Sequence, residues 1–293
     1  MTEGAFIVDR QPELDLAGKV AIVTGASRGI GKQAATALAR RGASLVLTAR
    51  TVEPGSKLPG TLGETQARIE QLGARAVTVP ANLASESDLH RIVDAAVDRF
   101  GGVDVLVNNA AATDGDYWAN GFLGLSREDW LYQFDVNTHA PFTLMQLVTP
   151  IMEARGGGRI INVTTASGEA YREPEEPSPM ESVGEFSLLV PGYFASKRAL
   201  DRLANVIAPE LARKNIFVIG LLPGLVTTEI MEMRVRENGL DDTTAVPMEV
   251  PARMVAYFAA CANPIEYAGR IFWAERELAE LGLDAGDRTS ATV

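Results

Sequence analysis

The chain has 293 residues, a formal net charge of −11 and a single cysteine. The acidity disfavours a nucleic-acid partner, because phosphate binding needs clustered lysines and arginines. No apolar run reaches the roughly 18 residues of a membrane-spanning helix, and the amino-terminal stretch MTEGAFIVDR lacks the basic and apolar regions of a signal peptide. We therefore expect a soluble, cytoplasmic protein whose partner is neither nucleic acid nor membrane.

The cysteine and histidine content argues against a metal centre. Cys261 stands alone, which excludes internal disulfides and cysteine-based metal clusters, and it suits a small core position. His90 and His139 are the only histidines, and at this spacing they do not form a metal site without further ligands. The sequence therefore predicts no bound metal.

Short apolar segments alternate with helical patterns along the whole chain. Apolar residues between positions 89 and 100 recur at helical spacing, and Ser85 with Asp88 resembles a capping box. This β–α alternation predicts an α/β fold, a doubly wound parallel sheet with helices on both faces, in one domain over 1–293. The segments interpreted as strands are 19–24, 44–49, 75–80, 103–108, 158–164 and 216–221, with a weaker candidate at 269–273.

A glycine-rich turn follows the first strand. Gly25, Gly29 and Gly31 lie between an apolar strand and an alanine-rich helix, with the spacing GxxxGxG rather than the general GxGxxG. Glycines let the backbone approach a pyrophosphate closely, and the helix N-terminus offers free N–H groups with partial positive charge. The turn predicts dinucleotide binding.

The end of the second strand indicates which dinucleotide is bound. Sheets that bind NAD usually carry an acidic residue there for the ribose 2′-hydroxyl, whereas this chain reads Ala49 and Arg50. Arg28, inside the glycine turn, points to the same region. A guanidinium can bind a 2′-phosphate bidentately. We therefore predict NADP(H) as the preferred cofactor, with NAD(H) still possible.

Tyr193 and Lys197 stand four residues apart in the stretch YFASK and share one face if that stretch is helical. A tyrosine has a pKa of about 10. A nearby ammonium lowers this pKa, so the tyrosine becomes a usable general acid or base near neutral pH.

Polar residues also stand at the ends of two earlier predicted strands. The segment VDVLVNNAAA (103–112) ends its strand with two asparagines, and GRIINVTTASG (158–168) ends its strand with Thr164, Thr165 and Ser167.

Six motifs in order make the chain resemble the short-chain dehydrogenase/reductase family, in its compact single-domain Rossmann form, over residues 16–230. They are TGASRGIG, NNAA, Asn137 in DVNTHAPF, the strand-end hydroxyls, YFASK and LLPGLVTT. The resemblance implies hydride transfer between a nicotinamide and a small-molecule carbonyl or alcohol. It implies Tyr193 as the acid or base, Lys197 as the group that lowers its pKa and holds the ribose, and Asn137 as anchor of a relay water. It also implies a homodimer or homotetramer.

The chain departs from the family pattern at two site positions. Thr165 stands where a serine usually holds the substrate oxygen; it keeps the hydroxyl, and its methyl narrows the site. Ser167 is the alternative holder, and Thr165 is then only a β-branched strand residue. Asn82 replaces the usual aspartate that contacts adenine. The residues expected to bind the cofactor are Gly25, Ser27, Arg28, Gly29, Ile30, Gly31, Arg50, Asn82, Leu83, Asn109, Ala110, Ala111, Tyr193, Lys197, Pro223, Gly224, Val226 and Thr228.

Three inserted segments bear on the substrate. The loop 51–63 resembles that of hydroxysteroid-dehydrogenase-like members. The acidic, proline-rich loop 169–192 is either a disordered surface loop or a lid that carries Phe186, Leu188 and Leu189 toward an apolar substrate. The segment 225–250 is expected to cover substrate and nicotinamide, with Met231 and Met233 as adaptable apolar surface and Thr228 near the carboxamide. A flexible tail is expected after about residue 284.

Two alternatives remain open from the sequence. The same groups serve alcohol oxidation with NADP⁺ as well as carbonyl reduction, so the direction is not fixed. A dinucleotide-binding regulatory protein without catalysis would also keep the glycine turn, although the Tyr193–Lys197 pair argues against it. The substrate is not determined, because this fold supports many carbonyl compounds.

Overall fold

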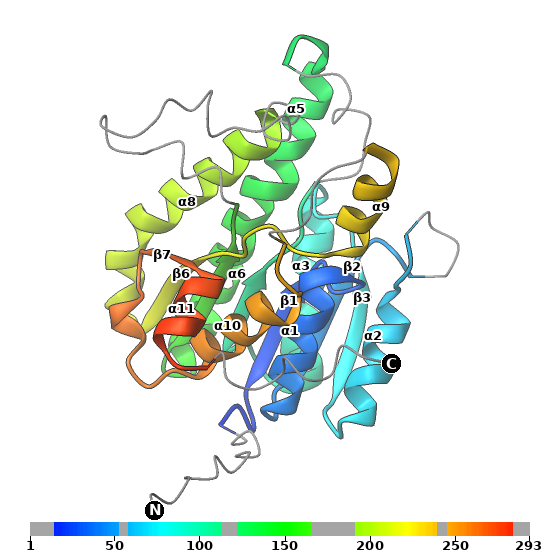
Figure 1. Cartoon of the computed structure of the whole chain (residues 1–293). Helices are drawn as coiled ribbons and strands as arrows, with labels where there is room; N and C mark the ends of the chain where they lie inside the picture. Colours follow the sequence, from blue (N-terminus) through cyan, green and yellow to red (C-terminus); the bar gives the residue numbers. More distant parts are fainter. Residues whose placement is uncertain (1–14, 53–57, 113–121, 166–190, 239–244, 284–293) are drawn as a thin grey trace, which may run out of the picture.

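The computed structural model describes residues 15–52, 58–112, 122–165, 191–238 and 245–283. Seven strands form one parallel sheet in the order β3-β2-β1-β4-β5-β6-β7 (Figure 1). The predicted doubly wound sheet is confirmed, including its weakest strand. The strands are β1 (Val20–Thr24), β2 (Ser44–Ala49), β3 (Ala76–Pro80), β4 (Val105–Asn108), β5 (Gly158–Val163), β6 (Ile216–Leu222) and β7 (Ile271–Trp273).

Helices cover both faces of the sheet. One face packs against α1 (Gly29–Arg40), α2 (Leu62–Gln71), α10 (Glu249–Ala260) and α11 (Ala274–Glu280). The other packs against α3 (Glu86–Phe100), α6 (Ala140–Ala154) and α8 (Pro191–Ala212). The remaining described elements are α5 (Arg127–Phe134), the π-helical turn η1 (Asp135–His139), α9 (Glu229–Asn238) and the short 3₁₀ turn η4 (Pro264–Glu266).

The strand sequences explain the two layers. All five residues of β1 are buried; Ala21 and Val23 belong to the core beside α1, while Val20 and Ile22 belong to the core beside α3. Successive strand side chains point to opposite faces. A parallel strand covered on both sides therefore reads as a continuous apolar run, which is why the sequence pattern located it.

The winding of the sheet reverses beside β1. This strand pairs with β2 on one side and with β4 on the other, where Val23 is in register with Val107. The chain after β1 turns toward one edge of the sheet, and the chain after β3 crosses to the other. In open α/β sheets the crevice at such a reversal, beyond the carboxyl ends of the strands, binds ligands.

One local prediction was wrong. Ser85 does precede α3, but its side chain makes no capping hydrogen bond, and its Oγ lies 3.0 Å from Oγ of Ser87. The carboxylate of Asp88 instead accepts from the main-chain N of Asn82 at 2.8 Å and from Arg91 at 2.6 Å. These two donors compete successfully for Asp88, so the reciprocal capping box does not form.

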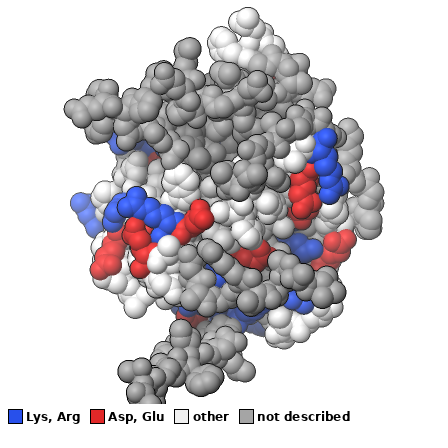
Figure 2. All heavy atoms as spheres, viewed as in Figure 1, with Lys and Arg blue, Asp and Glu red and all other residues white. Residues whose placement is uncertain are grey.

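Figure 2 shows one face of the molecule, on which lysine and arginine side chains lie among aspartates and glutamates. Within the part of the chain that the structure describes, no helix is both long and apolar enough to cross a membrane. The same residues contain no group of three or more His, Cys, Asp or Glu side chains placed to hold a metal ion.

Candidate active site

The turn between β1 and α1 is built on glycine. Gly25 and Gly29 adopt φ angles of +68° and +57°, which side-chain-bearing residues rarely take. A Cβ on Gly31 would lie 2.2 Å from the carbonyl oxygen of Gly25, so no larger residue fits without a backbone shift. Because α1 begins at Gly29, the N–H groups of Gly29, Ile30 and Gly31 start a helix at the crevice, as an anion site requires.

Residues at the end of β4 hold this turn in place. Nδ2 of Asn109 donates to the carbonyl oxygens of Thr24 at 2.8 Å and Gly25 at 3.3 Å. In return, Oγ1 of Thr24 accepts from the main-chain N–H groups of Asn109 and Ala110, each at 3.0 Å. The predicted ligand residue Asn109 therefore uses its side chain to tie two adjacent strand ends together.

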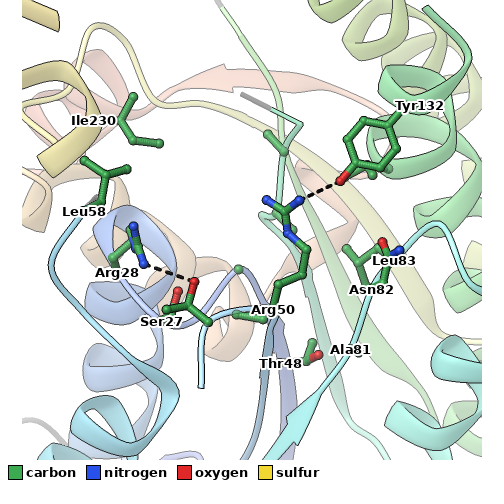
Figure 3. Close-up of a pocket in the computed structure, with 16 residues that line it drawn as sticks. Ser27, Arg28, Thr48, Arg50, Leu58, Ala81, Asn82, Leu83, Tyr132 and Ile230 are labelled. Carbon is green, nitrogen blue, oxygen red and sulfur yellow. Dashed lines mark hydrogen bonds between the residues drawn. The ribbon is translucent and has the colours of Figure 1, made fainter. Parts of the chain in front are cut away.

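A cavity of about 370 Å³ opens beside the turn, at the carboxyl ends of β1 to β4 (Figure 3). It gathers eight residues that the sequence predicted for cofactor binding. These are Gly25, Ser27, Arg28, Arg50, Asn82, Leu83, Ala110 and Ala111. The other residues that line it, which sequence reasoning missed, are Thr48, Ala49, Thr51, Leu58, Ala81, Tyr132, Val136 and Ile230.

Both predicted arginines face this cavity (Figure 3). Nη2 of Arg28 donates to Oγ1 of Thr51 and to the carbonyl oxygen of Gly60, each at 3.1 Å. Nη1 of Arg50 donates to the hydroxyl of Tyr132 at 2.7 Å. The described end of the 51–63 loop packs on the glycine turn, since a Cβ on Gly60 would lie 2.6 Å from the carbonyl oxygen of Ser27.

The predicted catalytic pair lies on α8, as the YFASK pattern requires. Tyr193 is partly exposed in the first turn of the helix, and Lys197 is 2 % exposed one turn later. Nζ of Lys197 donates to the carbonyl oxygen of Val163 at 2.7 Å, which joins the helix to the end of β5. Neither residue lines the cavity described above, so the pair and the arginines occupy separate parts of the carboxyl edge.

Burial controls the charge of this lysine. Removal from water lowers the pKa of Lys197 to about 8, and the carboxylate of Asp201 offsets part of that effect. Asp201 is itself buried, and its pKa is raised by burial, although hydrogen bonding from Thr164 and the charges of Arg198 and Lys197 oppose the shift. Oγ1 of Thr164 donates to Asp201 at 2.9 Å. The next residue, Thr165, is partly exposed, while Ser167 lies outside the described residues.

Asn137 is fully buried inside the π-helical turn η1, a rare conformation that is frequent at functional sites. Its Oδ1 accepts from the main-chain N of Ala112 at 2.9 Å, and its Nδ2 donates to Oγ of Ser196 at 2.9 Å. Ser196 in turn donates to the carbonyl oxygen of Tyr193 at 2.8 Å. Asn137 thus joins the segment after β4 to the helix that carries Tyr193 and Lys197. The relay water stays a prediction.

The sequence model described as "short chain dehydrogenase" matches residues 19–177, more than half of the chain. The chain belongs to the short-chain dehydrogenase family. It is therefore an oxidoreductase, and hydride transfer with a nicotinamide dinucleotide is the family's general reaction.

Similar proteins have related but different activities. The 7alpha-hydroxysteroid dehydrogenase of Escherichia coli K12 is 32% identical over 219 residues, 75% of either chain. A 3-oxoacyl-[acyl-carrier-protein] reductase of Synechocystis is 31% identical over 217 residues, 74% of this chain and 78% of the relative.

Two solved structures of family members show different cofactors. A 7-alpha-hydroxysteroid dehydrogenase, in complex with NADH and 7-oxo glycochenodeoxycholic acid, matches with a TM-score of 0.71 and 27% identity over 89% of this chain and 94% of the other. A 3-oxoacyl reductase from Agrobacterium tumefaciens C58 with NADP bound matches with a TM-score of 0.73 and 25% identity over 91% and 96%. Membership of the family therefore does not determine whether the cofactor is NAD or NADP.

The cavity fits the adenosine end of the family's dinucleotide. Thr48 is 1% exposed, and its Oγ1 has no hydrogen-bond partner among the described groups, although the residue lines the cavity. A buried hydroxyl without a partner is unfavourable unless a ligand or water satisfies it. Gly25 and Gly31 also pack closely against each other and against Asn109, the tight turn that dinucleotide-binding folds require. Asn82 lines the same cavity, and its Oδ1 accepts from the main-chain N of Ala84 at 3.2 Å.

The segment after β6 packs against the glycine turn of this family fold. Pro223 and Gly224 follow the strand, and Val226 pairs with Val246 in an isolated bridge. Oγ1 of Thr228 accepts from the main-chain N of Met231 at 3.3 Å at the start of α9. Its Cγ2 would lie 3.5 Å from a Cβ on Gly29, so Thr228 is next to the glycine turn.

Several predictions fall outside the described residues. They include most of the 169–192 loop with Phe186, Leu188 and Leu189, part of the 225–250 segment, and the tail after residue 284. Of the lining residues that were missed, Tyr132 and Val136 carried a usable signal. They stand four residues apart just before Asn137, so a helix there places both on one face.

Proposed function

We propose that this protein is an NADP(H)-dependent oxidoreductase that transfers hydride between the nicotinamide and a carbonyl or alcohol substrate. The observation that supports the cofactor preference is the charge of the cavity wall. Arg28 and Arg50 line it, and none of the described residues that line it is acidic. A 2′-phosphate is favoured by two guanidinium groups, whereas a 2′-hydroxyl is usually bound by a carboxylate.

The residues on α8 and β5 are proposed to handle the proton. Tyr193 donates its hydroxyl proton to the carbonyl oxygen during reduction and accepts one from the alcohol during oxidation. The ammonium of Lys197 stabilises the phenolate form. Thr165, two residues after the end of β5, holds the substrate oxygen through its hydroxyl, with Ser167 as the alternative. The dinucleotide, when bound, supplies or accepts the hydride.

Two experiments test this function. The affinities of the purified protein for NADPH and NADH, measured by nucleotide fluorescence, are expected to differ by about tenfold or more in favour of NADPH. Consumption of NADPH is then followed with a panel of ketones and aldehydes that includes an oxo-steroid and a 3-oxoacyl thioester, and formation of NADPH from NADP⁺ with the matching alcohols. Equal affinity for the two cofactors would contradict the NADP preference.

The same panel separates catalysis from regulation. A dinucleotide-binding regulatory protein would bind NADPH but turn over no substrate in either direction. The buried Lys197 one turn after Tyr193 favours the catalytic alternative, since a buried ammonium is costly to keep without a role. Turnover of any panel member would exclude the regulatory alternative.

A homodimer or homotetramer in the cytoplasm is part of the proposal. It is supported by exposed large apolar side chains on neighbouring helices: Trp130 and Leu131 of α5, Phe142 of α6 and Val206 of α8. Large apolar side chains on a surface often mark interfaces. Size-exclusion chromatography with light scattering is expected to give a molecular mass of two or four times the chain mass of 31.3 kDa. A monomer would contradict this part.

A further inference from the structure

Arg50 and Tyr132 connect two sides of the cavity. Arg50 follows β2, Tyr132 belongs to α5, and 82 positions separate them in the chain. Nη1 of the guanidinium donates to the phenol oxygen at 2.7 Å, a short hydrogen bond (Figure 3). Both residues line the cavity that fits the adenosine end of the dinucleotide.

The position of Tyr132 is set by the packing of its helix. Oγ of Ser126 accepts from the main-chain N of Asp129 at 3.0 Å and so caps the start of α5. Trp130 packs its ring against Phe134, with centroids 4.8 Å apart. Gln133, the residue after Tyr132, is fully buried and packs against Gly192 at the start of α8. These contacts hold α5 at its start and along its packed side, and the helix presents the phenol to the cavity.

A phenol suits this contact better than a carboxylate does. Holding a long arginine side chain in one geometry costs conformational entropy, and a hydrogen-bond acceptor reduces that cost at the moment of binding. A carboxylate would hold the guanidinium more strongly, but it would neutralise the charge and repel a phosphate. Tyr132 is a neutral acceptor, so this hydrogen bond places no negative charge beside Arg50.

We propose that Tyr132 is a positioning residue that holds the guanidinium of Arg50 over the adenosine end of the cavity, where it meets the 2′-phosphate of NADP(H). The inference rests on the proposed preference for NADP(H). It makes Tyr132 a determinant of cofactor specificity that acts through Arg50. Its effect is therefore confined to the cofactor that carries a 2′-phosphate.

Equilibrium binding without substrate tests this role. NADPH and NADH differ only in the 2′-phosphate, and their fluorescence reports binding without turnover. Tyr132→Phe removes the phenol oxygen and is expected to weaken NADPH binding about fivefold while NADH binding stays within about twofold. Arg50→Ala is expected to weaken NADPH binding about thirtyfold. In the Arg50→Ala background, Tyr132→Phe is expected to add no further loss.

Two more variants sharpen the result. Tyr132→Glu keeps an acceptor but neutralises the arginine, and we expect it to weaken NADPH binding more than Tyr132→Phe does. Tyr257→Phe makes the same chemical change at a hydroxyl that contacts Tyr267 at 2.9 Å, away from the cavity, and serves as the matched control with no change for either cofactor. Thermal unfolding of each variant confirms that it is folded.

The outcomes separate the two proposals. If Arg50→Ala weakens NADPH selectively but Tyr132→Phe changes neither cofactor, or changes both equally, the positioning role is wrong and the NADP preference stands. Additive losses in the double variant overturn the positioning role as well. If Arg50→Ala leaves NADPH binding unchanged, the proposed recognition of the 2′-phosphate fails, and the role of Tyr132 fails with it.

Discussion

Nζ of Lys197 lies 2.7 Å from the carbonyl oxygen of Val163, to which it donates a hydrogen bond. Val163 is the last residue of β5, and Thr165, the predicted substrate-holding residue, stands two positions later. One bond therefore ties the helix that carries Tyr193 to the strand end that carries Thr165. An ammonium has three donors, so this contact positions the lysine without using all of its hydrogen-bonding capacity.

Removal of the Tyr193 hydroxyl is expected to stop catalysis without loss of cofactor. In Tyr193→Phe, turnover should fall about 10²- to 10⁴-fold, because no proton reaches the substrate oxygen. The affinity for NADPH, measured by fluorescence, should stay within about twofold. The control is again Tyr257→Phe, which should retain full turnover. Wild-type turnover in purified Tyr193→Phe would rule out the assigned acid.

Replacement of Lys197 should change how stability depends on pH. Burial lowers the pKa of Lys197 to about 8 from the ordinary 10.5, so the charged form is disfavoured in the folded state. Lys197→Met removes this cost at pH 7, but it also removes the hydrogen bond to the carbonyl oxygen of Val163 and the attraction to Asp201. These effects oppose each other, so the free energy of unfolding at pH 7, measured by urea denaturation, is expected to change by no more than about 2 kcal/mol, while catalysis is lost.

The pH dependence of that difference follows from the direction of the shift. Below about pH 8 both states of the wild type carry the proton, and the full cost of the buried charge is present. Between pH 8 and 10.5 the unfolded chain binds more protons than the folded one. The wild type should therefore become more stable relative to the variant over that range. Lys214→Met, at a more exposed lysine paired with Glu153, serves as the control for loss of a lysine side chain.

Asn137 and Ser196 should prove energetically coupled. Asn137→Ala leaves the buried N–H of Ala112 without its acceptor and is expected to lower the free energy of unfolding by about 2 kcal/mol. Ser196→Ala is expected to cost about 1 kcal/mol. Because the two side chains are 2.9 Å apart, the double variant should lose less than the sum, with a coupling of about 1 kcal/mol. Purely additive losses in urea unfolding would show that this hydrogen bond contributes nothing.

The glycine turn gives a prediction with a matched control. In Gly31→Ala the new Cβ would lie 2.2 Å from the carbonyl oxygen of Gly25, and the backbone must shift. We expect a loss of stability of about 1–3 kcal/mol and a loss of NADPH affinity of about tenfold or more. The matched control is Gly63→Ala in α2, where the new Cβ would have Oγ1 of Thr61 as its nearest neighbour, at 3.9 Å. It should be neutral or up to about 1 kcal/mol more stable, with unchanged affinity. Equal behaviour of the two variants would contradict the close packing of the turn.

What the sequence determined by itself is local. The β1 strand reads as an apolar run because helices cover both of its faces, and the glycine turn is visible because the backbone conformation at Gly25 excludes most other residues. The Tyr193–Lys197 pair is visible because helical spacing places both on one face. One local prediction was nevertheless wrong: Asp88 accepts hydrogen bonds from Asn82 and Arg91 and does not complete a capping box with Ser85.

Only the tertiary structure decided which distant side chains meet. The pairs Arg50–Tyr132, Asn137–Ser196 and Thr164–Asp201 are separated by 82, 59 and 37 positions. Sequence periodicity records which face of an element is buried, because neighbours along the chain share that face. It does not record how one helix is shifted along another or along the sheet. That packing places Tyr132 at the arginine of a different strand end.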